Sequence, residues 1–411
     1  MEEMAKSIAN ASNAIKKKTS PSFYVSVVYV VSILLFNISN PLIPHIIFLI
    51  WLAITIVCDG RQLGSILSRK YYLAFYCFLL YYFASSLSAF SPGTCVNRVY
   101  TYLELVSPFI MYELYSGYDK KTKRILVLVF LAIYAVNFYQ MLTTINYSAI
   151  AGLRQHEDEE GYLNTGFNFI YSLSLVLTLL LYVFRKRSFK DERLLVTLLI
   201  VWTLSIIFIV FKSLYTTAIM LMGVGAVLAF FYGRKNWKSK LLVVGVVLIL
   251  LFIYLVPYVE KQLLSIDSEY ALITYRLNEI SSSLSGEGID ADASGGARLN
   301  RTLVSLNTFL HYPLFGVNHL TANREIFDGV LIGNHAEWVD SMAEYGVFSF
   351  LLFFFLIKSA KRVARNRGLN AVFLLYVIIG FLNPVMYCVQ NTICFFIIPI
   401  FHDCLIPSES N

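Results

Sequence analysis

The sequence predicts an all-α polytopic membrane protein. Of its 411 residues, 57% are hydrophobic and only 14% are charged, which is far more apolar than the composition of a soluble domain. The hydrophobic residues are gathered into runs of about 20 residues, the length that a helix needs to cross the hydrocarbon core of a bilayer. Lysines and arginines are concentrated in alternate loops between these runs, as expected for cytoplasmic loops.

The apolar runs predict about twelve transmembrane helices. Lys16, Lys17 and Lys18 precede the first run and resemble the start of a signal peptide. No small-residue cleavage pattern follows, so this run is predicted to be a retained span. The predicted spans lie at about residues 22–39, 43–58, 71–90, 98–116, 124–146, 165–184, 194–211, 213–232, 240–257, 341–357, 369–386 and 388–405.

The distribution of charge predicts the orientation of these helices. With the N-terminus in the cytoplasm, 25 of the 33 lysines and arginines fall in predicted cytoplasmic loops, in agreement with the positive-inside rule. Both termini are then cytoplasmic, and residues 258–340 lie on the outer face, which is periplasmic or extracellular. This outer segment contains eleven acidic and five basic residues. The net charge of +7 therefore reflects the cytoplasmic loops, and no nucleic-acid partner is predicted.

These features divide the chain into three parts. Residues 1–257 contain predicted spans one to nine, residues 258–340 form a large outer loop with helical segments, and residues 341–411 contain spans ten to twelve. The six cysteines include no CxxC pair, so neither a disulfide framework nor a zinc site is indicated. Asp290 and Asp292 form a D-x-D pair with no histidine at ligand spacing, so we predict no metal site and no cofactor.

The outer loop contains a predicted helix with two arginines on one face. Ser294 precedes a run of apolar residues at helical spacing, and Pro313 ends it. Arg298, Arg301 and Ser305 are spaced three and four residues apart, so they share one face of this helix. Two fixed cations on one face are suited to bidentate pairing with phosphate oxygens. The alternative is that both arginines pair with the acidic residues nearby.

His335 is the candidate acid–base residue. It follows Gly333 and precedes the apolar helix that re-enters the membrane, so we expect it at the outer interface. A neutral imidazole there can accept a proton from an attacking sugar hydroxyl; the alternative is a histidine that only anchors the helix end. Trp338 is a candidate to stack on a sugar. Arg276 is a candidate donor contact, although an ion pair with Glu279 is favoured.

Glu104 is the candidate polar residue within a predicted span. It lies in the fourth predicted span, and an isolated charge is costly in hydrocarbon, so ionisable residues there are retained mainly for function. We therefore include Glu104 among the candidate substrate-binding residues.

Three short segments follow one another in the outer loop. They are Gly295-Gly296 with Arg298, the run His311-Tyr312-Pro313-Leu314-Phe315-Gly316-Val317, and His335 ahead of Glu344-Tyr345-Gly346. Their order, together with twelve predicted spans and one large outer loop before the tenth, resembles the core of the O-antigen ligase and O-antigen/capsule polymerase superfamily.

The resemblance implies a GT-C-like glycosyltransferase whose donor is a glycan on a polyprenyl diphosphate. In a ligase the acceptor is a sugar of the lipid A core, whereas in a polymerase it is another lipid-linked repeat unit. By the family pattern, Arg298 would contact the donor diphosphate, and His335 would act as the base or position the acceptor.

The chain departs from the family pattern at one place. The family often has Ser-Arg-Thr-Ala at the start of the span that begins near residue 213, and this chain reads Ser213-Leu214-Tyr215-Thr216-Thr217-Ala218. Lys212 lies four residues before Thr216 on the same helical face and is the candidate replacement for the arginine. It supplies a point charge without the bidentate fork of an arginine. This departure weakens the ligase interpretation more than the polymerase interpretation.

We therefore expect a polymerase that joins undecaprenyl diphosphate-linked oligosaccharide repeat units on the outer face of a bacterial cytoplasmic membrane. The transfer would need no metal and would serve O-antigen or capsule/exopolysaccharide biosynthesis. Membrane lipids, a chain-length regulator and the flippase of the same pathway are the expected partners. The first alternative is the ligase. The second is a flippase of lipid-linked sugars, but transporters usually have repeated halves with broken helices near the midplane, and the sequence shows neither.

Overall fold

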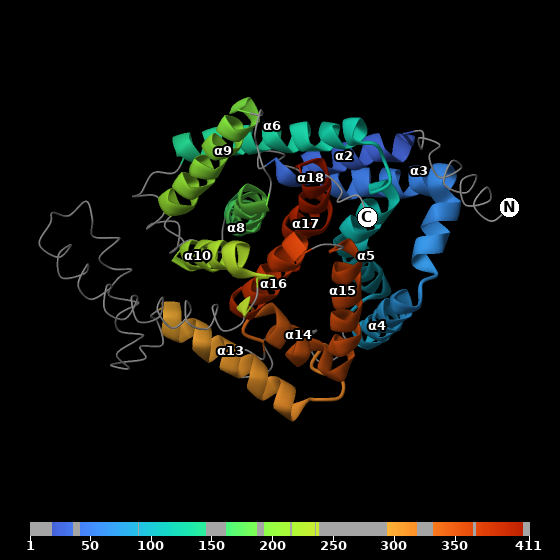
Figure 1. Cartoon of the computed structure of the whole chain (residues 1–411). Coiled ribbons are helices and arrows are strands. Elements are labelled where there is room, and N and C mark those ends of the chain that lie inside the picture. Colours follow the sequence, from blue (N-terminus) through green and yellow to red (C-terminus); the bar gives the residue numbers. More distant parts are fainter. Residues whose placement is uncertain are drawn as a thin grey trace, which may run out of the picture.

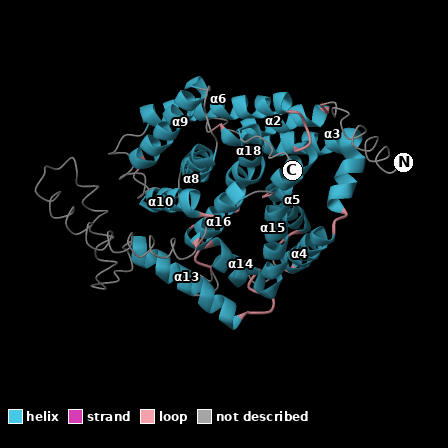
Figure 2. Ribbon diagram, viewed as in Figure 1, coloured by secondary structure: helices cyan, strands magenta, loops and turns pink. Residues whose placement is uncertain are grey.

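The computed structural model describes residues 19–35, 42–88, 90–144, 162–186, 193–213, 216–234, 236–237, 294–318, 332–364 and 367–405. Every regular element in these ranges is a helix (Figure 2). The prediction of an all-α fold is therefore confirmed for the part of the chain that the structure describes.

The first 231 residues of the chain supply eight of the described helices. They are α2 (Pro21–Leu34), α3 (Leu42–Leu67), α4 (Lys70–Leu87), α5 (Pro92–Tyr115), α6 (Lys120–Thr144), α8 (Tyr162–Lys186), α9 (Arg193–Lys212) and α10 (Thr216–Phe231). The C-terminal part supplies α13 (Ser294–His311), α14 (Glu337–Tyr345), the 3₁₀ turn η3 (Gly346–Phe348), α15 (Ser349–Val363), α16 (Arg367–Leu382), α17 (Cys388–Thr392), the π-helical turn η4 (Ile393–Ile397) and α18 (Ile398–Leu405).

The described helices fit a polytopic membrane protein. Among the described residues, six helical segments are long and apolar enough to cross a membrane: Leu42–Leu67, Lys120–Thr143, Asn168–Lys186, Arg193–Lys212, Glu337–Val363 and Cys388–Leu405. Every predicted span except 240–257, which lies outside the described residues, coincides with a described helical segment. The number twelve is not established. Helices α4 and α5 fall outside the group of six because tyrosines in α4 and charged residues in α5 lower their hydropathy.

Some boundaries differ from those predicted. The span predicted at 369–386 is helical only as far as Leu382, because Pro384 disfavours helical geometry in the residue before it. Helix α14 begins at Glu337, just before the predicted limit of the outer segment at residue 340. Gly346, with φ of +57°, separates α14 from α15.

Two helical segments form the centre of the fold. The most apolar windows of α8 and of α17–α18 are each 83% buried, against 17% for α3, and Figure 1 shows these segments surrounded by the others, with α3, α6 and α9 at the periphery. Two polar side chains of α8 donate to carbonyls of their own helix: Ser172 to Asn168 at 2.7 Å and Thr178 to Ser174 at 2.8 Å. Their hydroxyls can therefore be buried without an unmet hydrogen bond.

Ion pairs hold the helix ends that the sequence predicts to be cytoplasmic. Glu113 of α5 is 7% exposed and contacts both Arg69 and Arg362, the latter at 3.2 Å. The hydroxyl of Tyr71 also donates to Glu113 at 2.9 Å. This carboxylate therefore links α4, α5 and α15 at the end opposite to α13 and α14.

Replacing Glu113 with glutamine should destabilise the protein. The change leaves two arginines close together without their shared anion, and loss of hydrogen bonds to a charged group costs about 2 kcal/mol. The measurement is the thermal unfolding midpoint in detergent, which should fall for Glu113→Gln and stay unchanged for the control Lys121→Gln, at an exposed position of α6. An unchanged midpoint in both variants would contradict a stabilising role for Glu113.

Candidate functional site

Helices α13 and α14 are joined through a serine and an aspartate. The hydroxyl of Ser305 on α13 donates to Oδ1 of Asp340 on α14 at 2.5 Å and accepts the backbone N–H of Gly333 at 2.8 Å. Oδ2 of Asp340 accepts the N–H of Ala336 at 2.8 Å. The segment from Gly333 to Ala336 is therefore held between the two helices.

This junction places Arg301 against His335. Nη1 of Arg301 lies 2.7 Å from Nε2 of His335. Because a guanidinium can only donate, Nε2 is the acceptor, and the imidazole is neutral with its proton on Nδ1. The prediction that Arg301 and Ser305 share one face of a helix agrees with this arrangement, since both contact the segment that leads into α14.

A close approach of two backbones makes the contact possible. A Cβ atom at Gly333 would lie 2.1 Å from the carbonyl oxygen of Arg301. Glycine is therefore needed at this position for His335 to come within reach of α13. Asn334 has a φ of +57°, a conformation that asparagine adopts more readily than most residues.

The other candidates in this part of the chain have different surroundings. The indole N–H of Trp338 donates to the carbonyl of Val377 at 2.8 Å, and its ring fills the space that a side chain at Gly380 would need. Trp338 therefore packs on α16. Arg298 lies on α13, but its side chain is outside the described residues, and so is Arg276.

Lys212 and Glu104 each have partners of their own. Nζ of Lys212 donates to the carbonyl of Leu142 near the end of α6 at 3.0 Å. Glu104 is 1% exposed and lies 2.7 Å from Nδ1 of His45, whose side chain is 43% exposed, and it accepts the hydroxyl of Tyr29 at 3.2 Å. No described hydrogen bond joins either residue to Arg301 or His335.

The turn after α13 pairs with the end of α14 through the backbone. The N–H groups of Val317 and Asn318 donate to the carbonyls of Ala343 and Glu344 at 3.1 and 3.0 Å, and the N–H of Val347 donates to Pro313 at 2.8 Å. These bonds satisfy carbonyls that the end of a helix leaves unpaired. The second and third segments of the resemblance, residues 311–317 and 344–346, are thus direct neighbours in space.

Two glycines permit this pairing. Gly316 and Gly346 have φ of +60° and +57°, a region that glycine enters without steric cost. A Cβ atom at Gly316 would also lie 2.3 Å from the carbonyl oxygen of Glu344. A larger residue at Gly316 would therefore force the turn away from α14.

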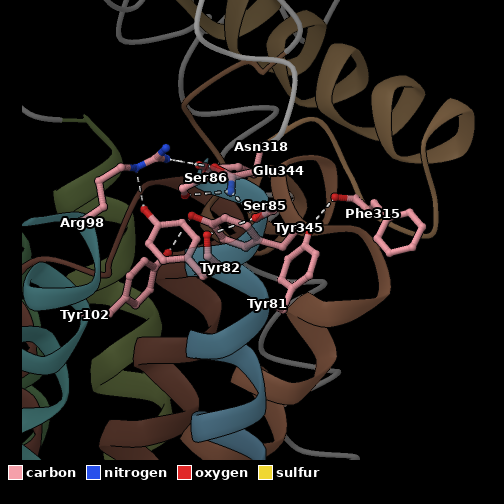
Figure 3. Close-up of polar contacts among 10 residues, drawn as sticks. All are labelled: Tyr81, Tyr82, Ser85, Ser86, Arg98, Tyr102, Phe315, Asn318, Glu344 and Tyr345. Carbon is pink, nitrogen blue, oxygen red and sulfur yellow. Dashed lines mark hydrogen bonds and ion pairs between the residues drawn. The ribbon is translucent and has the colours of Figure 1, made fainter. Parts of the chain in front are cut away.

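Arg98 of α5 lies beside this pairing and was not a candidate from sequence (Figure 3). Its Nε donates to the hydroxyl of Tyr82 at 2.8 Å, and its Nη2 donates to Asn318 at 3.0 Å and to Glu344 at 3.2 Å. We call Tyr82, Arg98, Asn318 and Glu344 the Arg98 network. One signal in the sequence could have found Arg98: it is an arginine at the predicted outer end of a span, whereas most basic residues lie on the other side.

Replacing Ser305 with alanine should loosen the junction of α13 and α14. The change removes the donor to Asp340 and the acceptor for Gly333, at a cost of about 1–3 kcal/mol for buried groups left unpaired. Hydrogen exchange of the peptide that contains residues 333–340 should become faster than in the wild type. Asn300→Ala, at an exposed position of the same helix, is the control, and equal exchange rates in the two variants would contradict the assignment.

Comparison with known proteins gives one family. Residues 202–354 match the family model described as O-antigen ligase, and no curated protein matches the chain. The matched stretch includes Lys212, α13, His335 and α14. Members of this family are glycosyltransferase-like enzymes that act on lipid-linked oligosaccharides, so the match supports a function of the ligase or polymerase type in glycan assembly. Over these residues, the chain is similar to the O-antigen ligase and polymerase superfamily.

Proposed function

We propose that this protein is a polymerase that joins undecaprenyl diphosphate-linked oligosaccharide repeat units on the outer face of a bacterial cytoplasmic membrane. The observation that carries the proposal is the 2.7 Å contact between Arg301 and His335 within the stretch that matches the family. A cation suited to a diphosphate and an imidazole suited to a hydroxyl group are thereby adjacent.

The chemistry is a transfer of a glycosyl group. The bond between the anomeric carbon of the donor and the diphosphate oxygen breaks, and the diphosphate leaves with the electron pair. A hydroxyl oxygen of the acceptor forms the new bond to that carbon, and its proton passes to Nε2 of His335. Arg301, with Arg298 from the same helix, stabilises the charge that develops on the leaving diphosphate.

The contact between Arg301 and His335 suggests how the two roles are coupled. In the structure, Nε2 of His335 accepts a hydrogen bond from Arg301. A diphosphate that binds Arg301 would accept the hydrogen bond that Nη1 now donates to His335, because a guanidinium bonds more strongly to charged phosphate oxygens than to a neutral imidazole. Nε2 can then accept a hydrogen bond from the acceptor hydroxyl, so His335 acts as the base only when the donor is bound.

We propose that the transfer needs no metal ion. The arginines of α13 supply the positive charge that stabilises the leaving group.

The polymerase is favoured over the ligase by the span that begins near residue 213. Lys212 takes the place of the family's arginine, and an ammonium group has no bidentate fork to offer a diphosphate. In the structure, this ammonium donates to the carbonyl of Leu142. The ligase, which transfers the glycan to the lipid A core, is the alternative. A chain-length regulator and a flippase of the same pathway are proposed partners of the polymerase.

A reconstitution assay separates these activities. The purified protein is incubated in proteoliposomes with a labelled lipid diphosphate-linked repeat unit, with and without lipid A core. A ladder of products without the core supports the polymerase, and a single transfer that requires the core supports the ligase. Translocation of the label without any new glycosidic bond would support a flippase and contradict the proposal.

Replacing His335 with alanine should lower kcat by about 10²-fold or more, because general-base catalysis contributes about 10²–10⁴-fold. The rate of ladder formation is the measurement. His311→Ala is the matched control, since His311 is an exposed histidine on α13 that bonds the carbonyl of Asn307, and its rate should stay near that of the wild type. A His335→Ala protein that forms the ladder at the normal rate would remove the role assigned to His335.

A further inference from the structure

The α4–α5 hairpin contacts both segments that frame the candidate site. Asn318, on the turn after α13, donates to the hydroxyls of Ser85 and Ser86 at 2.6 and 3.2 Å. Tyr345, at the end of α14, shares a hydrogen bond with Tyr102 at 2.6 Å. These contacts attach the outer loop to two of the apolar helices (Figure 3).

Arg98 bonds to both segments and to the hairpin at the same time. Its hydrogen bonds reach Tyr82 on α4, Asn318 on the turn and Glu344 on α14. The guanidinium also lies 4.4 Å from the ring centroid of Phe90 and 5.0 Å from that of Tyr82. A planar fork held between two aromatic rings and three acceptors has one orientation, which the ammonium group of a lysine cannot reproduce.

Arg98 is not arranged to bind a substrate phosphate itself. Nε and Nη2 are committed to protein acceptors, and Nη1 is buried, with no hydrogen-bond partner among the described residues. The side chains of Arg98 and Glu344 are each 22% exposed, so the pair is only partly screened by water. Arg98 is therefore placed to hold the turn after α13 and the end of α14 together.

The hydrogen bonds of Arg98 fix the ends of α13 and α14 that lie away from Arg301 and His335. Arg301 is ten residues from His311 on α13, a distance of about 15 Å along a helix. Rotation of α13 by about 4° around its C-terminal end would therefore move Arg301 by about 1 Å. A displacement of this size can cost about 10²-fold in rate.

We propose that Arg98 is a positioning residue for glycosyl transfer, which keeps Arg301 and His335 in register by fixing Asn318 and Glu344 against the α4–α5 hairpin. The inference rests on the proposed function of the site. It assigns a role to a residue more than 200 positions away in sequence from both segments that it fixes, at separations of 220 and 246 residues.

The test uses the full-length protein with Arg98→Met and Arg98→Lys. Hydrogen exchange of peptides that contain residues 312–318 and 343–348 should become faster in Arg98→Met, while kcat falls at least tenfold and KM for the lipid-linked donor changes less than threefold. Arg98→Lys, which keeps the charge without the fork, should give intermediate values in both measurements. Arg362→Met, which removes an arginine from the Glu113 pair at the opposite end, should leave these exchange rates and kcat unchanged.

Two outcomes would overturn the proposal. If exchange becomes faster while kcat stays at the wild-type value, the network is structural only. If kcat falls while exchange is unchanged, Arg98 acts on the substrate directly. Should the wild-type protein form no glycosidic bond at all, the proposed function fails, and unchanged exchange in both Arg98 variants would then refute the restraint independently of activity.

Discussion

The arrangement of the site depends on the backbone pairing between the turn after α13 and the end of α14. The N–H groups of Val317 and Asn318 meet carbonyls at the end of α14, and Gly316 and Gly346 adopt the positive φ angles that the approach requires. Because both helices are rigid, a fixed joint at this end determines where their other ends lie. Arg301 and His335 are brought into contact there, with Ser305 and Asp340 as a second joint.

The charged residues at the two ends of the described helices have different partners. At the end opposite to α13, the carboxylate of Glu113 pairs with two arginines of the protein itself. At the α13–α14 end, the exposed guanidinium of Arg301 faces a neutral imidazole instead of a carboxylate. A cation whose protein partner is neutral keeps its full charge for an anionic ligand, which agrees with the proposed binding of a diphosphate.

The sequence predicted features with local signals and missed those that depend on distant contacts. Helix α13 begins at Ser294 and ends at His311, just before Pro313, as the local signals predict, and the spacing of Arg301 and Ser305 placed them on one face. The early end of α16 was missed, although Pro384 offered a local signal. Arg98 could not be predicted from spacing, because its partners are 220 and 246 residues away and only the packing of α4 and α5 brings them together.

The central claim is that α13, α14 and the groups between them lie on the outer side of the membrane, where lipid-linked glycans would be joined. The most direct measurement is labelling of Leu303→Cys, at an exposed position of α13, with a membrane-impermeant maleimide in intact spheroplasts. The account predicts that this variant is labelled more strongly than the wild-type protein before the membrane is permeabilised. Labelling that appears only after permeabilisation would place α13 on the cytoplasmic side and contradict the account.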